Sequence, residues 1–140
     1  RWQRQLIRLG VDEAQAETRI VETQRELLRC LNGANRWVFD SVGVQAECEL
    51  KLATSERQGD EEYHKHCVVD RTLVVNGERW IIDFKTSHKH EAQTEEEFIA
   101  SQKEEYRPQL ESYGELFRGF EDTPQRLALL LTSIDALVEL

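Results

Sequence analysis

Two aspartates and a lysine lie near the centre of the sequence, in two runs that read as β-strands. The runs flank Asn76-Gly77, a pair that tolerates the positive φ angles of a type I′ hairpin turn. With that turn as the loop, Asp70 lies directly opposite Asp83, and Lys85 projects from the same face two residues further on. Directly opposed side chains have Cβ atoms about 4.5–5.5 Å apart, so the three charged groups are expected to share one small patch.

Two facing carboxylates repel each other, and folding alone gives no reason to place them together. A divalent cation between Asp70 and Asp83 would remove the repulsion, and hard oxygen ligands suit Mg²⁺ or Mn²⁺. The hairpin therefore predicts a metal site. The alternative is a solvated sheet face on which Lys85 is the salt-bridge partner of the aspartates.

The opposite face of this hairpin supports the same register. Six residues assigned to it are all apolar, and a slip by one residue would turn them toward the polar side. These residues are Val69, Leu73, Val75, Trp80, Ile82 and Phe84.

Before the hairpin, the sequence predicts helices over residues 1–31, with Asp12 as the N-cap of the second and Asn32-Gly33 at its end. Residues 36–39 are consistent with a short strand, and Val44–Leu52 alternates like a half-buried strand. In that strand Ala46, Cys48, Leu50 and Leu52 are assigned to one face. The polar residues 54–65 are expected to form a surface loop.

After the hairpin, the sequence predicts a short helix over residues 95–102 and a second helix that ends near Arg118. Pro108 fits the first turn of the second helix, where its missing N–H does no harm. Gln109 and Tyr113 are four residues apart and so share one face of it; the alternative is an amphipathic helix with Gln109 in water. Two strands follow, at 126–132 and 136–140. The fold class is α/β (mixed α+β), a single domain around a mixed sheet.

Composition restricts the class of protein. The 140 residues carry a net charge of −9, with 39% hydrophobic and 32% charged residues, which is typical of one globular domain. No run approaches the ~18 apolar residues of a membrane span. Three widely spaced cysteines form neither a disulfide framework nor a CxxC signature, so a cytoplasmic location is expected. The chain begins at Arg1 and contains no Met, which suggests a fragment of a longer protein.

The acidic charge is unusual for a nucleic-acid partner, because such proteins normally carry a basic patch. Only a local patch is available here. Its candidates are Arg71, Arg79, Lys85, Lys89 and Arg107. If DNA is the substrate, most of the affinity is expected to come from elsewhere in the parent protein.

Together, three motifs resemble the RecB-like branch of the PD-(D/E)XK nuclease superfamily, as found at the C-terminus of RecB- and AddA-type helicase–nucleases. The motifs are Val69-Asp70-Arg71, Ile82-Asp83-Phe84-Lys85-Thr86-Ser87, and the Q-x-x-x-Y signature from Gln109 to Tyr113. The resemblance runs from about Glu47 to the C-terminus. The family usually has a metal-binding His on a helix before the first strands, and no His occurs here before His64.

The resemblance implies a restriction-endonuclease-like core over residues 44–140, preceded by N-terminal helices over 1–35. It implies a Mg²⁺- or Mn²⁺-dependent deoxyribonuclease, similar to exonuclease V, that acts in DNA repair and recombination. Expected partners are single-stranded DNA or duplex ends, the helicase domains of the parent chain and a second helicase–nuclease subunit.

The resemblance also assigns roles to single residues. Asp70, Asp83 and the Phe84 backbone carbonyl would bind the metal, with Glu47 as an additional ligand. Lys85, Gln109 and Tyr113 would complete the catalytic set, and Arg71, Tyr106 and Arg107 would contact DNA. Two alternatives stay open: an inactive nuclease fold that docks DNA or a partner, and a structural domain whose carboxylate pair binds Ca²⁺ or nothing.

Overall fold

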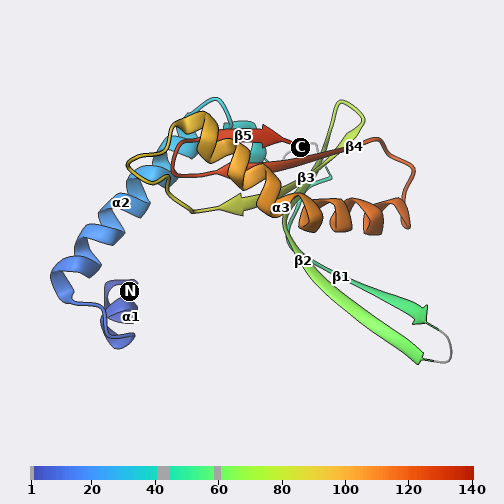
Figure 1. The fold of residues 1–140 in the computed structure, drawn as a ribbon, viewed down its shortest axis with the longest axis horizontal. Helices are drawn as coiled ribbons and strands as arrows, with labels where there is room; N and C mark the ends of the chain where they lie inside the picture. Colours follow the sequence, from blue (N-terminus) through green and yellow to red (C-terminus); the bar gives the residue numbers. More distant parts are fainter. Residues whose placement is uncertain (1, 41–44, 59–60) are drawn as a thin grey trace.

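The computed structural model describes residues 2–40, 45–58 and 61–140 and has a mixed α/β fold (Figure 1). This confirms the predicted class. Its elements are α1 (Trp2–Arg8), α2 (Glu13–Asn32), a 3₁₀ turn η1 (Arg36–Phe39), β1 (Glu47–Gln58), β2 (Glu61–Val75), β3 (Glu78–Lys85), α3 (Glu95–Arg118), β4 (Gln125–Leu131) and β5 (Ala136–Glu139). No helix in the described ranges is long and apolar enough to cross a membrane.

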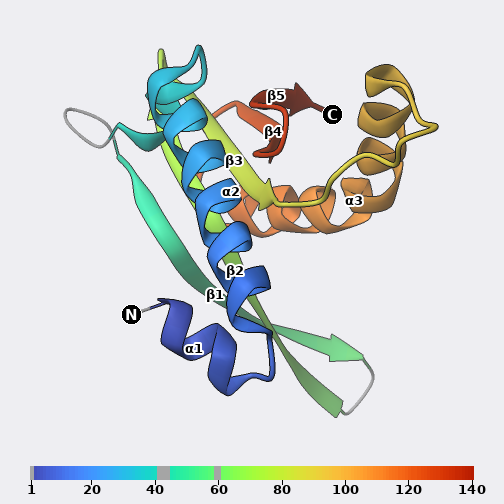
Figure 2. The ribbon, with the colours of Figure 1, turned by 90° about the vertical axis from the view of Figure 1, so that its left-hand side faces the viewer.

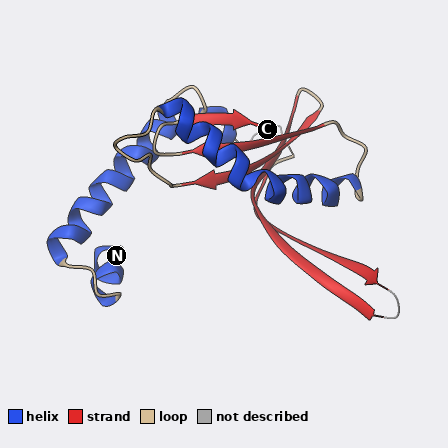
Figure 3. Ribbon diagram, in the orientation of Figure 1, coloured by secondary structure: helices blue, strands red, loops and turns tan. Residues whose placement is uncertain are grey.

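The five strands form one sheet in the order β1-β2-β3-β4-β5. All neighbours are antiparallel except β3 and β4, which are parallel and are connected through α3 (Figure 3). The parallel pair places the end of β3, where Asp83 and Lys85 lie, in the middle of the sheet. On the β4 side, Asp83 and Lys85 pair with Leu129 and Leu131.

The predicted hairpin register is confirmed. Asn76 and Gly77 have φ angles of 53° and 80°, Val75 pairs with Glu78, and the described ladder runs to Arg71 and Ile82. Asp70 and Asp83 follow directly after this last pair.

Two apolar cores cover the two faces of the sheet. On one face Ile81, Leu129 and Leu131 pack against α3 through Phe98, Leu110, Tyr113 and Phe117. On the other face Leu73, Ile82, Ala128 and Leu130 pack against Val38 of η1, with Trp37 and Phe39 beside it. The residues predicted to share an apolar hairpin face lie in the second core, with the exception of Val69.

Two predictions about faces are wrong: Val69 does not share the face of the other five hairpin residues, and the apolar residues of the predicted strand 44–52 do not share one face. Val69, Leu50 and Leu52 pack in the α3-side core, whereas Ala46 packs in the η1-side core. Between these groups Glu49 has a φ of 52°, flanked by the pairs Cys48–Arg71 and Leu50–Val69. A single left-handed residue interrupts the regular alternation of sides, so the strands exchange faces at this point, which is level with Asp70.

The predicted surface loop over residues 54–65 is also wrong. β1 and β2 continue through it as a long two-stranded arm, paired as far as Gln58 and Glu61, that projects from the body (Figure 1). Tertiary pairing overrides the polar composition of this segment, since strand preference depends on context.

α3 is one helix instead of the two predicted, and Pro108 lies in its interior. Figure 2 shows that the helix bends, the usual effect of a proline that removes one N–H from the helical ladder. The helix starts with a capping box between Thr94 and Glu97, which satisfies two free N–H groups.

The N-terminal prediction of two helices is confirmed, including Asp12 as the N-cap of α2, although residues 36–39 form a 3₁₀ turn and not a strand. The end of α2 is attached to the turn after β4. Cys30 Sγ donates to the Thr132 carbonyl at 3.6 Å, and Arg29 donates to the Ser133 carbonyl at 2.9 Å. The last two strands lie at the predicted positions.

Candidate active site

Asp83 is the centre of the site. It lies on β3, is only 3% exposed, and contacts residues from both β3 and α3. The Lys85 ammonium lies 2.8 Å from Asp83 Oδ2, and the Gln109 side-chain amide donates to Oδ1 at 3.2 Å. The predicted Asp–Lys contact is present, but it is buried and not solvated.

Asp70 lies beside this pair. Its Oδ2 accepts a hydrogen bond of 2.8 Å from the Phe84 N–H, so the side chain takes the place of a strand partner where the β2–β3 ladder ends. The Phe84 N–H thus lies against Asp70. The Phe84 carbonyl oxygen, which belongs to the following peptide group, stays a predicted metal ligand.

Burial raises the pKa of Asp83 above its ordinary value. The hydrogen bond and charge of Lys85 oppose this shift, and the nearby Asp70 carboxylate adds to it. The net direction means that burial and Asp70 together outweigh the attraction of Lys85. Apart from the ion pair with Lys85, Asp83 Oδ2 makes no hydrogen bond of good geometry within the described chain. Lys85 is thus the single partner of this carboxylate oxygen within the described residues.

Gln109 and Tyr113 hold the Asp83 carboxylate in place from α3. The Gln109 amide nitrogen donates to Asp83 and also to the Tyr113 hydroxyl at 2.7 Å, and Tyr113 is 8% exposed. The alternative that placed Gln109 in water is therefore wrong. Leu110 and Phe117 of the same helix lie in the core.

Tyr106 covers the lysine from one turn earlier in α3. The Lys85 ammonium lies 3.6 Å from the centre of its ring, within the range of a cation–π contact. Arg107 points elsewhere and pairs with Glu111 on the exposed side of the helix, at 3.7 Å.

Arg71 is not brought to this site. It is 4% exposed, and its guanidinium donates to the Val38 and Asp40 carbonyls and to Cys48, near the η1-side core. Arg79 is likewise buried, between Glu121, Gln45 and Thr72. Two of the five arginines and lysines considered for a basic patch therefore serve the fold.

Glu47 lies on the edge strand, exposed and paired with Thr72. Among the side chains that the structure describes, which exclude residues 1, 41–44, 54 and 56–65, no group of three or more from His, Cys, Asp and Glu is placed to hold a metal ion. The two carboxylates that do meet are Asp70 and Asp83. Mg²⁺ needs only one or two carboxylates when waters and a substrate phosphate supply the other ligands, so this donor set suits Mg²⁺ or Mn²⁺.

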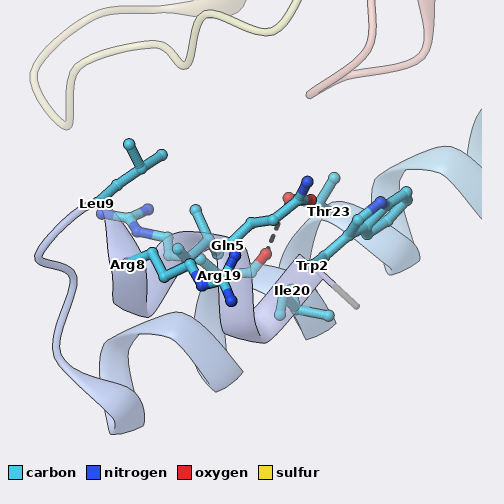
Figure 4. A pocket seen from close by; sticks show the side chains of 8 residues that line it. Trp2, Gln5, Arg8, Leu9, Arg19, Ile20 and Thr23 are labelled. Carbon is cyan, nitrogen blue, oxygen red and sulfur yellow. Dashed lines mark hydrogen bonds between the residues drawn. The ribbon is translucent and has the colours of Figure 1, made fainter.

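A separate pocket of about 630 Å³ lies between α1 and α2 (Figure 4). Its lining includes Trp2, Leu6, Leu9 and Ile20 together with Arg8 and Arg19. None of the residues of the Asp83 site lines it, and we assign it no chemistry.

Gln102, on the same side of α3 as Tyr106, was not among the predicted site residues. Gln102 precedes Tyr106 by four residues and is 7% exposed. The spacing of Gln102, Tyr106, Gln109 and Tyr113 repeats at four, three and four residues, which marks one helix face. This periodicity could have revealed it.

Replacing Tyr113 by phenylalanine is expected to lower the free energy of unfolding by about 1 kcal/mol, because the partly buried Gln109 amide loses one of its two acceptors. Urea unfolding followed by circular dichroism measures this. Tyr106→Phe is the matched control: it keeps the ring over Lys85 and should change stability by less than half as much.

Comparisons with known proteins leave the family open. No protein-family model matches this sequence, and no curated protein sequence matches it. One solved structure, described as "Crystal structure of SSO0001", is similar with a TM-score of 0.43 and 19% sequence identity. The match covers 91% of this chain and 50% of that one, so this chain spans half its length.

Proposed function

We propose that this chain is a divalent-cation-dependent nuclease domain that hydrolyses DNA phosphodiesters, as part of a helicase–nuclease of DNA repair and recombination. The observation that carries the proposal is the buried carboxylate of Asp83, which lies beside the Asp70 carboxylate and the Lys85 ammonium. Asp70, Lys85, Gln109 and Tyr113 surround it, and these are the residues that the motif resemblance selects.

Asp70 and Asp83 would hold the cation, with the Phe84 carbonyl as a further oxygen. The raised pKa of Asp83 supports this assignment. A divalent cation would offset both the cost of burying the Asp83 charge and the repulsion between Asp83 and Asp70. Bound Mg²⁺ or Mn²⁺ lowers the pKa of a coordinated water and offsets charge on a phosphate.

The protein side chains then have distinct tasks. Gln109 fixes Asp83 through Oδ1, which leaves Oδ2 to face the cation and the lysine. Tyr113 fixes Gln109. Lys85, held between a carboxylate and an aromatic ring, supplies a positive charge to a phosphate oxygen or orients the attacking water.

Affinity for DNA is expected to come largely from outside this chain. Its net charge is −9, and Arg71 and Arg79 are buried. Helicase domains of the parent chain and a second helicase–nuclease subunit are the proposed source, with Tyr106 and Arg107 as local contacts.

The test is cleavage of end-labelled single-stranded DNA with Mg²⁺ or Mn²⁺, comparing the chain with Asp70→Asn. We expect cation-dependent cleavage that falls by at least about 10²-fold in the variant. Asp122→Asn is the matched control, because Asp122 is an exposed aspartate between α3 and β4, and it should cleave like the parent chain.

If the chain and its variants bind DNA equally but none cleaves it, the inactive docking module is correct instead. Cleavage that survives both Asp70→Asn and removal of the cation by EDTA would contradict the proposal.

A further inference from the structure

Gln102 carries an unusual buried group. The residue is 7% exposed, and its side-chain oxygen is fully buried yet accepts no hydrogen bond within the described chain. A buried carbonyl without a donor is unfavourable by about 1–3 kcal/mol, so a second state in which it is satisfied would explain why a glutamine is tolerated there.

The Lys85 ammonium is a donor that lies over Tyr106, one turn of α3 away from Gln102. β3 and α3 run in opposite directions, because Arg79 lies over Phe117, Asp83 contacts Gln109 and Lys85 contacts Tyr106. Gln102, four residues before Tyr106, therefore lies beyond the end of β3, about 6 Å from Tyr106 along the helix axis. A lysine on a flexible four-carbon stem can swing across that distance.

Two hydroxyl groups near Lys85 are already engaged. The Tyr106 hydroxyl interacts with Glu105, and the Thr132 hydroxyl donates to the Lys85 carbonyl at 3.3 Å. The lysine itself is held by one carboxylate oxygen, Asp83 Oδ2. Any event that neutralises Asp83 frees the ammonium, which then needs another acceptor.

We propose that Gln102 is a positioning residue that accepts the Lys85 ammonium when the Asp83 charge is taken by a cation. Lys85 thus alternates between Asp83 and Gln102 across the face of the Tyr106 ring. The claim that a cation is the natural trigger rests on the proposed function. The claim that Gln102 is the alternative acceptor for Lys85 does not.

The experiment is a thermal-unfolding cycle on the metal-free chain, in which Asp83→Asn takes the place of charge neutralisation. Gln102→Met has similar length and no acceptor. We expect it to raise Tm by about 5 °C in the parent chain, where the buried carbonyl has no donor, but to lower Tm by about 5 °C in the Asp83→Asn background. The loss should vanish when Lys85→Met is added to that background, and Gln102→Glu should avoid it.

A purely structural glutamine, or one that binds a buried water, would give the same change in Tm in every background, and that result would overturn the inference. A second readout is Mn²⁺ affinity measured by calorimetry, which we expect to fall about 10-fold in Gln102→Met. If the chain binds no Mn²⁺, the proposed function fails, whereas the unfolding cycle still decides the role of Gln102.

Discussion

Replacing Lys85 by methionine should lower the free energy of unfolding by about 3–5 kcal/mol, the usual effect of removing one partner from a buried ion pair. The lysine side chain is 17% exposed and that of Asp83 5%, so water cannot easily replace the ammonium. Methionine preserves most of the apolar stem and its packing, and therefore isolates the charge. Equilibrium unfolding in urea at pH 7 measures the loss.

Two comparisons give this result its meaning. Lys89→Met removes an exposed lysine nearby and should change stability by no more than about 0.5 kcal/mol. Combining Lys85→Met with Asp83→Asn should restore most of the loss, because no unpaired carboxylate remains buried. A small effect of Lys85→Met alone would show that the pair contributes little.

Replacing Asp83 by asparagine should have opposite effects on activity and stability. Cleavage is expected to fall by at least about 10²-fold, since a proposed metal ligand is lost. Stability at pH 7 should be retained or increased, because asparagine keeps an acceptor for Gln109 and removes a charge whose burial outweighs its attraction to Lys85. A stable but inactive variant is the expected result.

The pH dependence of this stability follows from the raised pKa of Asp83. Between the unfolded and folded pKa values the native chain binds the proton more tightly, so the Asp83 contribution to stability falls as pH rises through that interval. Below the unfolded pKa, about 3.9, parent and Asp83→Asn should differ little. The advantage of the variant should grow as pH rises through the folded pKa of Asp83.

Chemical denaturation of both proteins from pH 4 to pH 8 measures this difference. An advantage that shrinks as pH rises would mean that Lys85 more than compensates for the burial of Asp83.

Local chemistry in the sequence was sufficient to predict the hairpin. Asn76-Gly77 accept positive φ angles, and the apolar alternation beside them allows one register. That register alone brings Asp70 next to Asp83, and the four-residue spacing of Gln109 and Tyr113 places them on one helix face. These features depend on neighbours within a few residues, which is why the sequence could reveal them.

Tertiary contacts decided the features that the sequence did not predict. Pro108 lies within one bent helix, although its type favours a helix start. Polar residues around Gln58 and Glu61 form an arm because β1 and β2 pair with each other. Glu49 turns the strand over with a left-handed backbone, so Val69 belongs to the opposite core.

The chemical character of the site was decided in the same way. The sequence suggests that Arg71 is a surface cation. In the structure it is buried, and it donates hydrogen bonds to the carbonyls of Val38 and Asp40. The sequence places Asp83 beside Asp70 as a predicted metal ligand but does not indicate its burial, whereas packing of α3 over β3 removes it from water and raises its pKa. The sequence alone determined which residues meet in the hairpin and on α3. The tertiary structure determined how dry their surroundings are, because burial depends on elements that are distant along the chain.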